Sequence, residues 1–155
     1  STDASTATGR WTWRRFSQSI KETISPDKYR NSGLSAELCE RIYARMSQLM
    51  ETEKLYREND LCLDILAKKL NTSRHHLSRV INEKTGMNFF DYINSLRITE
   101  AKTLLLESSK KEMNIIEVAY TVGYNNKVSF NKTFKKMTGL TPTAYRMQKE
   151  KGKSL

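Results

Sequence analysis

Cysteine, proline and glycine are all scarce in this sequence. Two cysteines, Cys39 and Cys62, cannot frame a disulfide-rich secreted domain. Each stands alone in a segment of helical spacing, so we expect both to be small buried apolar residues. Six glycines and two prolines in 155 residues are too few for a fold built of hairpins and tight turns. These shortages exclude a disulfide scaffold and argue against an all-β fold.

Long apolar runs are also absent. No stretch approaches the roughly 20 apolar residues that cross a membrane, and the mean hydropathy is −0.67. No charged-then-apolar signal peptide opens the chain. A reducing cytoplasm is therefore the simplest compartment. Because the chain opens with Ser rather than Met, a second interpretation also stays open. In it, the chain is a fragment of a protein that is tethered to a membrane through a region absent from this sequence.

Catalytic and metal-binding patterns are missing as well. We find no glycine-rich phosphate loop, no paired catalytic carboxylates and no Ser-His-Asp arrangement, so we do not expect an enzyme. His75 and His76 are adjacent, and adjacent side chains on a helix point about 100° apart. No cysteine or carboxylate at ligand spacing completes a set around them, so we expect no metal and no other cofactor.

Basic residues, by contrast, are abundant and unevenly distributed. Lys and Arg number 27 against 17 Asp and Glu, which gives a net charge of +10. Residues 114–155 hold eight basic and two acidic groups, or +6. Such an excess favours a polyanionic partner, either nucleic acid or an acidic membrane surface. Lys127, Lys132, Lys135 and Lys136 alternate with apolar residues at helical spacing, which indicates a basic helix face rather than a tail.

Apolar spacing predicts an all-α fold. The expected helices are bounded by capping residues at their starts and by glycine or other turn residues at their ends. We expect them near residues 35–50, 63–70, 73–84, 88–107, 115–122, 126–137 and 142–148. In the third and sixth of these we expect the following side chains to face the core: Leu77, Val80, Ile81, Phe130, Thr133, Phe134 and Met137.

The first 60 residues carry no motif of function. We interpret residues 1–33 as a linker with a short helix, and residues 34–60 as a connecting helix. The Trp and Arg residues at 11–15 leave two interpretations open. They form either a short helix packed on residues 35–55 or a junction to a missing sensor or membrane region.

The sequence contains one unit twice. Both copies consist of a short helix, a turn, a second helix and a glycine, and one extra residue lies in the second turn. The aligned pairs are Ala67 with Ala119 and Leu70 with Val122 at an offset of 52, then Leu77 with Phe130, Ile81 with Phe134 and Gly86 with Gly139 at an offset of 53. This pattern is typical of two helix-turn-helix units, whose second helix enters a DNA major groove.

Residues 61–146 closely resemble the DNA-binding domain of the AraC/XylS family of bacterial transcription regulators. The more specific stretch is IIEVAYTVGYNNKVSFNKTFKKMTGLTPTAYR at residues 115–146. The positions that match the family pattern are Gly123-Tyr124, Phe130, Phe134-Lys135, Gly139-Leu140-Thr141-Pro142 and Tyr145-Arg146. The resemblance implies an AraC-type DNA-binding domain at 61–155, with helix-turn-helix subdomains at 61–87 and 114–148 and a linker helix at 88–108.

The candidate DNA contacts lie on the outward faces of the two second helices. Arg79 is suited to a guanine edge and Asn131 to an adenine edge, and each such pair gives roughly 1–3 kcal/mol of discrimination. The resemblance places base-contacting side chains at His75, Ser78, Arg79, Lys127, Val128, Asn131 and Lys132. We assign phosphate contacts, which add affinity without sequence information, to Ser73, Arg74, Asn126, Lys135 and Lys136.

Two of these positions depart from the family pattern. Position 132 is often Arg in the family, and the Lys found here lacks the planar guanidinium that makes two parallel hydrogen bonds. Position 128 is often a hydroxyl residue, and Val can only offer an apolar contact to a thymine methyl group. We therefore expect the second unit to be less selective than the first.

The leading prediction is sequence-specific binding to double-stranded DNA in adjacent major grooves, with RNA polymerase as a further partner in regulating transcription. A helix over 89–107 is about 28 Å long, close to the ~34 Å between major-groove segments on one DNA face. Two alternatives stay open: the effector end of a larger membrane or ligand sensor, and a non-specific nucleic-acid binder. The sequence leaves the operator, the effector, the oligomeric state and the direction of regulation undetermined.

Overall fold

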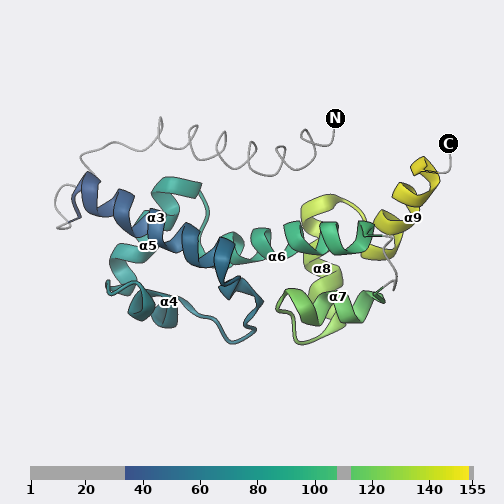
Figure 1. The fold of residues 1–155 in the computed structure, drawn as a ribbon, viewed down its shortest axis with the longest axis horizontal. Helices are drawn as coiled ribbons and strands as arrows, with labels where there is room; N and C mark the ends of the chain where they lie inside the picture. The colour runs from purple at the N-terminus through teal and green to yellow at the C-terminus, as the bar shows by residue number, and fades with distance from the viewer. Residues whose placement is uncertain (1–33, 108–112, 154–155) are drawn as a thin grey trace. The chain divides into compact units, whose positions relative to one another are not determined.

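The structure is a computed structural model that describes residues 34–107 and 113–153, with side chains as far as Gln148 (Figure 1). Within these ranges there are helices and no strands, so the all-α prediction is confirmed. The elements are α3 (Ala36–Thr52), the 3-10 turn η1 (Leu55–Arg57), α4 (Leu63–Lys69), α5 (Arg74–Thr85), α6 (Phe89–Leu106), α7 (Ile115–Val122), α8 (Lys127–Thr138) and α9 (Pro142–Lys153). The short helix expected within residues 1–33 lies outside the described residues.

The described residues divide into two compact units. Unit 1 comprises residues 34–55 and Leu61–Tyr92, and unit 2 comprises Tyr56–Asp60 and the residues from Ile93 onward. In unit 1, α3 and α4 both pack against α5; in unit 2, α7 and α9 both pack against α8. Figure 1 shows each of these groups around its central helix. In each unit, two helices therefore pack against a third, which is α5 in unit 1 and α8 in unit 2.

The two turns that precede α5 and α8 are built from the same hydrogen bonds. These bonds run from Thr72 N to Ala67 O (3.0 Å) and Asn71 N to Lys68 O (3.1 Å), and from Tyr124 N to Ala119 O (2.9 Å) and Gly123 N to Tyr120 O (3.2 Å). They form the Schellman pattern, in which the residue after the helix is left-handed. That residue is Asn71 at φ 53° and Gly123 at φ 116°. The alignment of Ala67 with Ala119 is thus confirmed.

The helices α5 and α8 also begin and end alike. The side chain of Ser73 accepts a hydrogen bond from the backbone N–H three residues on at 3.0 Å, and that of Asn126 does the same at 2.7 Å. Each cap satisfies one N–H of the first helical turn. Both helices end at a left-handed glycine, Gly86 at φ 74° and Gly139 at φ 84°. The predicted limits of both helices are confirmed to within one residue.

Aromatic rings fill the core of unit 2. The ring of Phe130 lies 5.4 Å from Tyr124 and 5.7 Å from Phe134, and Phe134 meets Tyr145 of α9 edge-on at 5.4 Å. Such offset and edge-on pairs add to the free energy gained by burial. Met137 is 41% exposed, so the prediction that it faces inward is wrong. Burial on α8 follows the i, i+4 row through 130 and 134, and Met137 lies beside that row.

The two cysteines of unit 1 have different surroundings. Cys39 on α3 is buried, as predicted, and its thiol donates to Glu83 Oε2 at 3.1 Å. Cys62 is exposed, and the prediction that it is buried is wrong. It is the residue before α4, in extended conformation, and therefore lies outside the helical spacing from which its burial was inferred.

The last helix is longer than predicted. It begins at Pro142, where the Thr141 hydroxyl accepts from the Ala144 N–H at 3.1 Å, and it continues to Lys153 rather than to about 148. Residues 148–151 are Gln and Lys or Glu, which are good helix formers. No stop signal precedes Gly152, so the helix continues through them.

Candidate nucleic-acid interface

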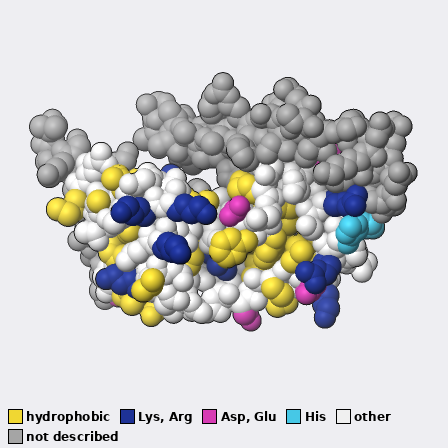
Figure 2. Space-filling view, turned by 180° about the vertical axis from the view of Figure 1, so that it is seen from behind, with side chains coloured by type: hydrophobic (Ala, Val, Ile, Leu, Met, Phe, Trp, Pro, Cys, Tyr) yellow, Lys and Arg dark blue, Asp and Glu magenta, His cyan; other side chains and the backbone are white. Residues whose placement is uncertain are grey.

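Helix α5 has an apolar face in the core and a polar face toward solvent. Leu77, Val80 and Ile81 are fully buried, as predicted. The opposite side carries His75, Ser78 and Asn82, all exposed, together with the half-buried Arg79. Histidine occurs only at positions 75 and 76, so the cyan patch in Figure 2 marks the surface of α5, and Lys or Arg side chains in dark blue lie beside it. The polar surface predicted for the first unit is present.

The acidic residue of α5 is directed away from that polar face. Glu83 accepts the hydrogen bond from Cys39, and the next residue, Lys84, is buried in an ion pair with Glu40. Both contacts join α5 to α3. They fix the C-terminal turn of α5 and direct its one carboxylate toward α3.

The residues at the start of α5 keep hydrogen-bonding capacity for a phosphate. The Ser73 hydroxyl accepts from the His76 N–H, so its own proton is still available to donate. Arg74 Nε lies 3.5 Å from Asp64 Oδ1, and both side chains are well exposed. A surface pair of this kind contributes little to stability, so the guanidinium can exchange this carboxylate for a DNA phosphate.

Helix α8 presents the most basic surface of unit 2. Its buried side is formed by Phe130 and Phe134, both fully buried. The opposite side carries no acidic residue. Lys127, Val128, Lys132, Lys135 and Lys136 are exposed, and Asn131 is half-buried. The outward set predicted from the sequence is therefore brought together on one helix.

Two details of α8 concern its contact chemistry. Val128 is 76% exposed, the highest fraction among the large apolar side chains described. An exposed valine is suited to an apolar contact such as a thymine methyl group. Asn126 uses its Oδ1 as the cap of α8 and donates one amide hydrogen to Asn125 Oδ1 at 3.0 Å. The second amide hydrogen is left to donate to a phosphate.

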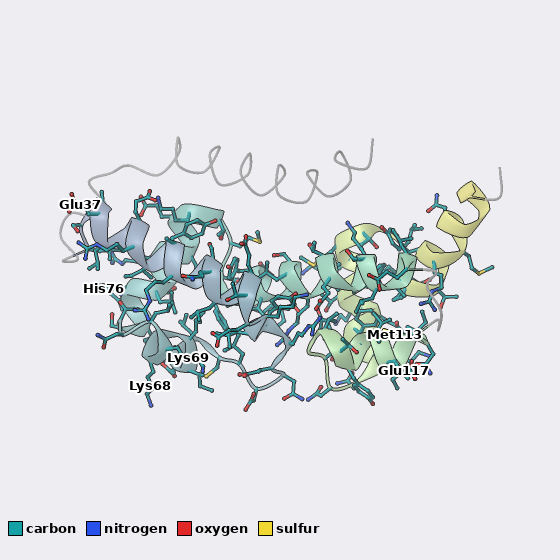
Figure 3. All side chains as sticks on the ribbon, in the orientation of Figure 1. Glu37, Lys68, Lys69, His76, Met113 and Glu117 are labelled. Atoms are coloured by element: carbon teal, nitrogen blue, oxygen red, sulfur yellow. The ribbon has the colours of Figure 1, made fainter. Side chains whose placement is uncertain are left out.

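Two exposed lysines were not among the contacts predicted from the sequence, which came from the second helix of each helix-turn-helix unit. Lys68 and Lys69 end α4, the first helix of the first helix-turn-helix (Figure 3). The first helix of such a motif crosses the DNA backbone. Adjacent lysines at its C-terminus are the signal that could have added them to the phosphate contacts.

The described residues offer neither a metal cluster nor a membrane span. No group of three or more His, Cys, Asp or Glu side chains in residues 34–107 and 113–153 is arranged to hold a metal ion. None of the helices described is both long and apolar enough to cross a membrane.

Comparison of this sequence with known proteins identifies the family to which the chain is similar. A family profile described as a helix-turn-helix domain matches residues 66–148. The uncharacterized HTH-type transcriptional regulator YtdP of Bacillus subtilis is 35% identical over 92 residues, which are 59% of this chain and 12% of YtdP. The chain thus spans about an eighth of that relative.

Solved structures have the same fold. The C-terminal domain of AraT, a response regulator from Geobacillus stearothermophilus, superposes with a TM-score of 0.61 at 30% identity, covering 75% of this chain and 88% of that one. The DNA-binding domain of AdpA, solved in complex with a target DNA, gives a TM-score of 0.60 at 23% identity over 70% and 91% of the two chains. The family whose profile matches residues 66–148 consists of transcription regulators and not of enzymes. The chain belongs to the AraC-type family of DNA-binding helix-turn-helix transcription regulators.

Proposed function

We propose that this chain is the sequence-specific DNA-binding end of a transcription regulator, with α5 and α8 in adjacent major grooves of one duplex. The observation that carries the proposal is the repeated helix-turn-helix structure. Two turns with the same hydrogen bonds precede two 12-residue helices, and each helix buries its apolar side and exposes a polar one. An 18-residue α6 is about 27 Å long, compatible with the ~34 Å repeat of a duplex.

We assign roles to the outward-facing residues of these helices by their chemistry. Base edges are contacted by His75, Ser78, Arg79, Lys127, Val128, Asn131 and Lys132. Phosphates are contacted by Ser73, Arg74, Asn126, Lys135 and Lys136, to which we add Lys68 and Lys69. In this division the first group supplies discrimination, whereas the second supplies affinity and salt dependence.

The chain acts, in this proposal, as the output end of a longer protein. YtdP is about eight times longer than the matched segment, and AraT, whose C-terminal domain has this fold, is a response regulator. We therefore favour a sensor located outside this chain, with regulation exerted in the cytoplasm through RNA polymerase. Co-purification of RNA polymerase on operator DNA with the full-length protein tests the second partner.

A salt titration distinguishes specific from non-specific binding. The chain is titrated with a duplex selected from a random pool and with a scrambled duplex of the same composition, between 50 and 200 mM salt (concentrations over which phosphate-dominated affinity falls by about 10³–10⁵). The proposal predicts tighter binding to the selected duplex at every salt concentration. Equal affinities would instead support a non-specific binder. RNA binding is disfavoured because the aromatic rings of α8 are buried, whereas RNA platforms expose theirs.

A further inference from the structure

A five-residue segment from outside both helix-turn-helix units belongs to unit 2. Tyr56–Asp60 follows α3 and precedes α4, yet it groups with the residues from Ile93 onward. Its contacts within unit 2 are made with α6 and with the turn between α7 and α8. That turn leads directly into α8, so whatever holds it sets where α8 begins.

Arg97 of α6 joins the segment to this turn. Its Nε donates to the Tyr56 carbonyl at 2.7 Å and its Nη2 donates to the Glu58 carbonyl at 2.9 Å. The same guanidinium lies over the ring of Tyr124, 5.4 Å from the centroid, and is held there by a cation–π attraction. Burial lowers the pKa of Arg97, but a guanidinium keeps its charge in proteins. One side chain thus contacts the segment on one side and the turn on the other.

Tyr124 is also held by contacts with α6 and α8. Its hydroxyl donates to Asn94 Oδ1 of α6 at 2.5 Å, and its ring packs on Phe130 of α8. A displacement of Tyr124 would therefore move the first turns of α8. Because α8 is a short helix whose outward side chains would bind base edges, a shift of about 1 Å is enough to weaken such contacts.

Gly123 brings the segment and the turn into direct contact. A Cβ at this position would lie 2.5 Å from the Tyr56 carbonyl oxygen, 2.8 Å from Arg97 Nε and 3.0 Å from the Arg57 carbonyl oxygen. Side-chain carbon is excluded at such distances, so only glycine allows the segment this close. On the other side, Arg57 forms an ion pair with Glu100 of α6, with Nε donating to Oε1 at 2.8 Å.

From these contacts we propose that Arg97 is a positioning residue for DNA recognition, which uses the segment Tyr56–Asp60 to set the turn before α8. The inference rests on the proposed function. It adds a determinant of the second half-site that lies outside both helix-turn-helix units. Residues 56–60 follow α3 in the sequence and belong to unit 2. The affinity of α8 for its half-site therefore depends on how this segment is held.

The test measures DNA discrimination at each half-site separately. The whole chain, with Arg97→Gln, Arg97→Lys, Arg57→Gln or the control Lys102→Gln, is titrated with three duplexes at a temperature far below its Tm. One duplex carries both selected half-sites, and each of the others has one half scrambled. Asn131→Ala identifies which half belongs to α8. Lys102 lies on the same helix, so the control removes a like charge without touching the carbonyls of the segment.

Arg97→Gln should weaken binding to the intact duplex about ten-fold and leave the duplex with a scrambled α8 half almost unchanged. Arg57→Gln should cause a smaller loss of affinity at the same half-site. In the double variant, the losses of Arg97→Gln and Arg57→Gln should not add up. Arg97→Lys keeps a positive charge over Tyr124 but cannot donate to two carbonyls in one plane. Compared with Arg97→Gln, the Lys variant should regain the Tm of the unchanged chain but not its preference for the selected α8 half-site.

Three results would overturn the inference. They are full discrimination in Arg97→Gln, an equal loss at both half-sites, and complete rescue by Arg97→Lys. A purely structural role predicts that binding follows the Tm, which the Lys variant tests. If the unchanged chain shows no preference for the selected duplex, the proposed function fails and this inference fails with it.

Discussion

Asn71 and Gly123 occupy the same position in two copies of one turn, but their surroundings differ. Both are left-handed residues that follow the first helix of a helix-turn-helix. Asn71 is exposed, and Asn tolerates this conformation. At Gly123, the carbonyls of Tyr56 and Arg57 occupy the space of a side chain. One position requires only a tolerant backbone, whereas the other requires glycine.

Gly123→Ala should therefore destabilise the chain more than Gly139→Ala. Both changes place a Cβ on a left-handed residue, which costs about 1–2 kcal/mol. Only at 123 does the new carbon also overlap backbone atoms, whereas none lies within 4 Å at 139; overlap adds about 1–3 kcal/mol. Urea unfolding of the two variants measures the difference. Equal losses would show that the segment Tyr56–Asp60 does not press on the turn.

The buried Cys39 predicts a dependence of stability on alkaline pH. Burial, followed by the hydrogen bond with Glu83, raises the pKa of the Cys39 thiol from 9.0 to about 12. The unfolded thiol ionises near 9 while the folded one stays protonated, so unfolding releases a proton in that window. The free energy of unfolding should then fall as pH rises from about 9 to about 12.

Comparison of two variants isolates the contribution of Cys39. Cys39→Ala should flatten the alkaline fall in stability, whereas Cys62→Ala should not, because Cys62 is exposed. Tyr56 and Tyr124, whose pKa values burial raises to about 12, maintain part of the slope in both. Iodoacetamide should label Cys62 quickly and Cys39 only after unfolding. Rapid labelling of Cys39 in the folded chain would contradict its burial.

At the scale of the element, α7 depends on its first turn. Asn114 Oδ1 accepts from the Glu117 N–H at 2.8 Å, and the Glu117 carboxylate accepts from the Asn114 N–H at 3.1 Å. Glu117 is labelled in Figure 3. This reciprocal pair is a capping box. It starts a helix of only eight residues, which has few other local bonds.

Asn114→Ala should destabilise unit 2 by about 1 kcal/mol, the usual loss for an N-cap. Asn114→Ser keeps an oxygen acceptor and should lose only a few tenths of that. Hydrogen exchange of the α7 amides, together with urea unfolding, measures both. If the Ala and Ser variants are equally stable, the cap does not control the start of α7.

The exposed faces of α5 and α8 predict two kinds of mutant. Arg79→Ala should relax selectivity at one base position, with a loss of roughly 1–3 kcal/mol on the preferred duplex. Lys136→Ala should weaken all duplexes alike and reduce the salt slope by about 1. Binding to a panel of single-base variants at several salt concentrations separates the effects. Identical behaviour of the two mutants would refute the division into base and phosphate contacts.

At the scale of the whole molecule, local patterns predicted the helices and the repeat. Apolar spacing, N-caps such as Ser73, and glycines such as Gly139 determine where helices begin and end, and these signals lie within a few residues of each other. The outward position of Lys127 and Lys132 follows directly from the burial of Phe130 and Phe134. These features needed no tertiary information.

Other features depend on contacts between distant residues and could not be predicted. The place of the segment Tyr56–Asp60 in unit 2 depends on Arg97, about 40 positions away. The exposure of Met137 and of Cys62 has a local cause instead. Met137 lies beside the buried row of its own helix, and Cys62 precedes the first turn of α4.

Selection of bound duplexes from a random pool tests the central proposal most directly. If α5 and α8 each recognise a major-groove segment, the selected duplexes should share two short conserved half-sites whose centres lie about 10 base pairs apart. Arg79→Ala should alter one half-site and Asn131→Ala the other. A single conserved half-site, or a selected pool with no conserved sequence, would contradict the account.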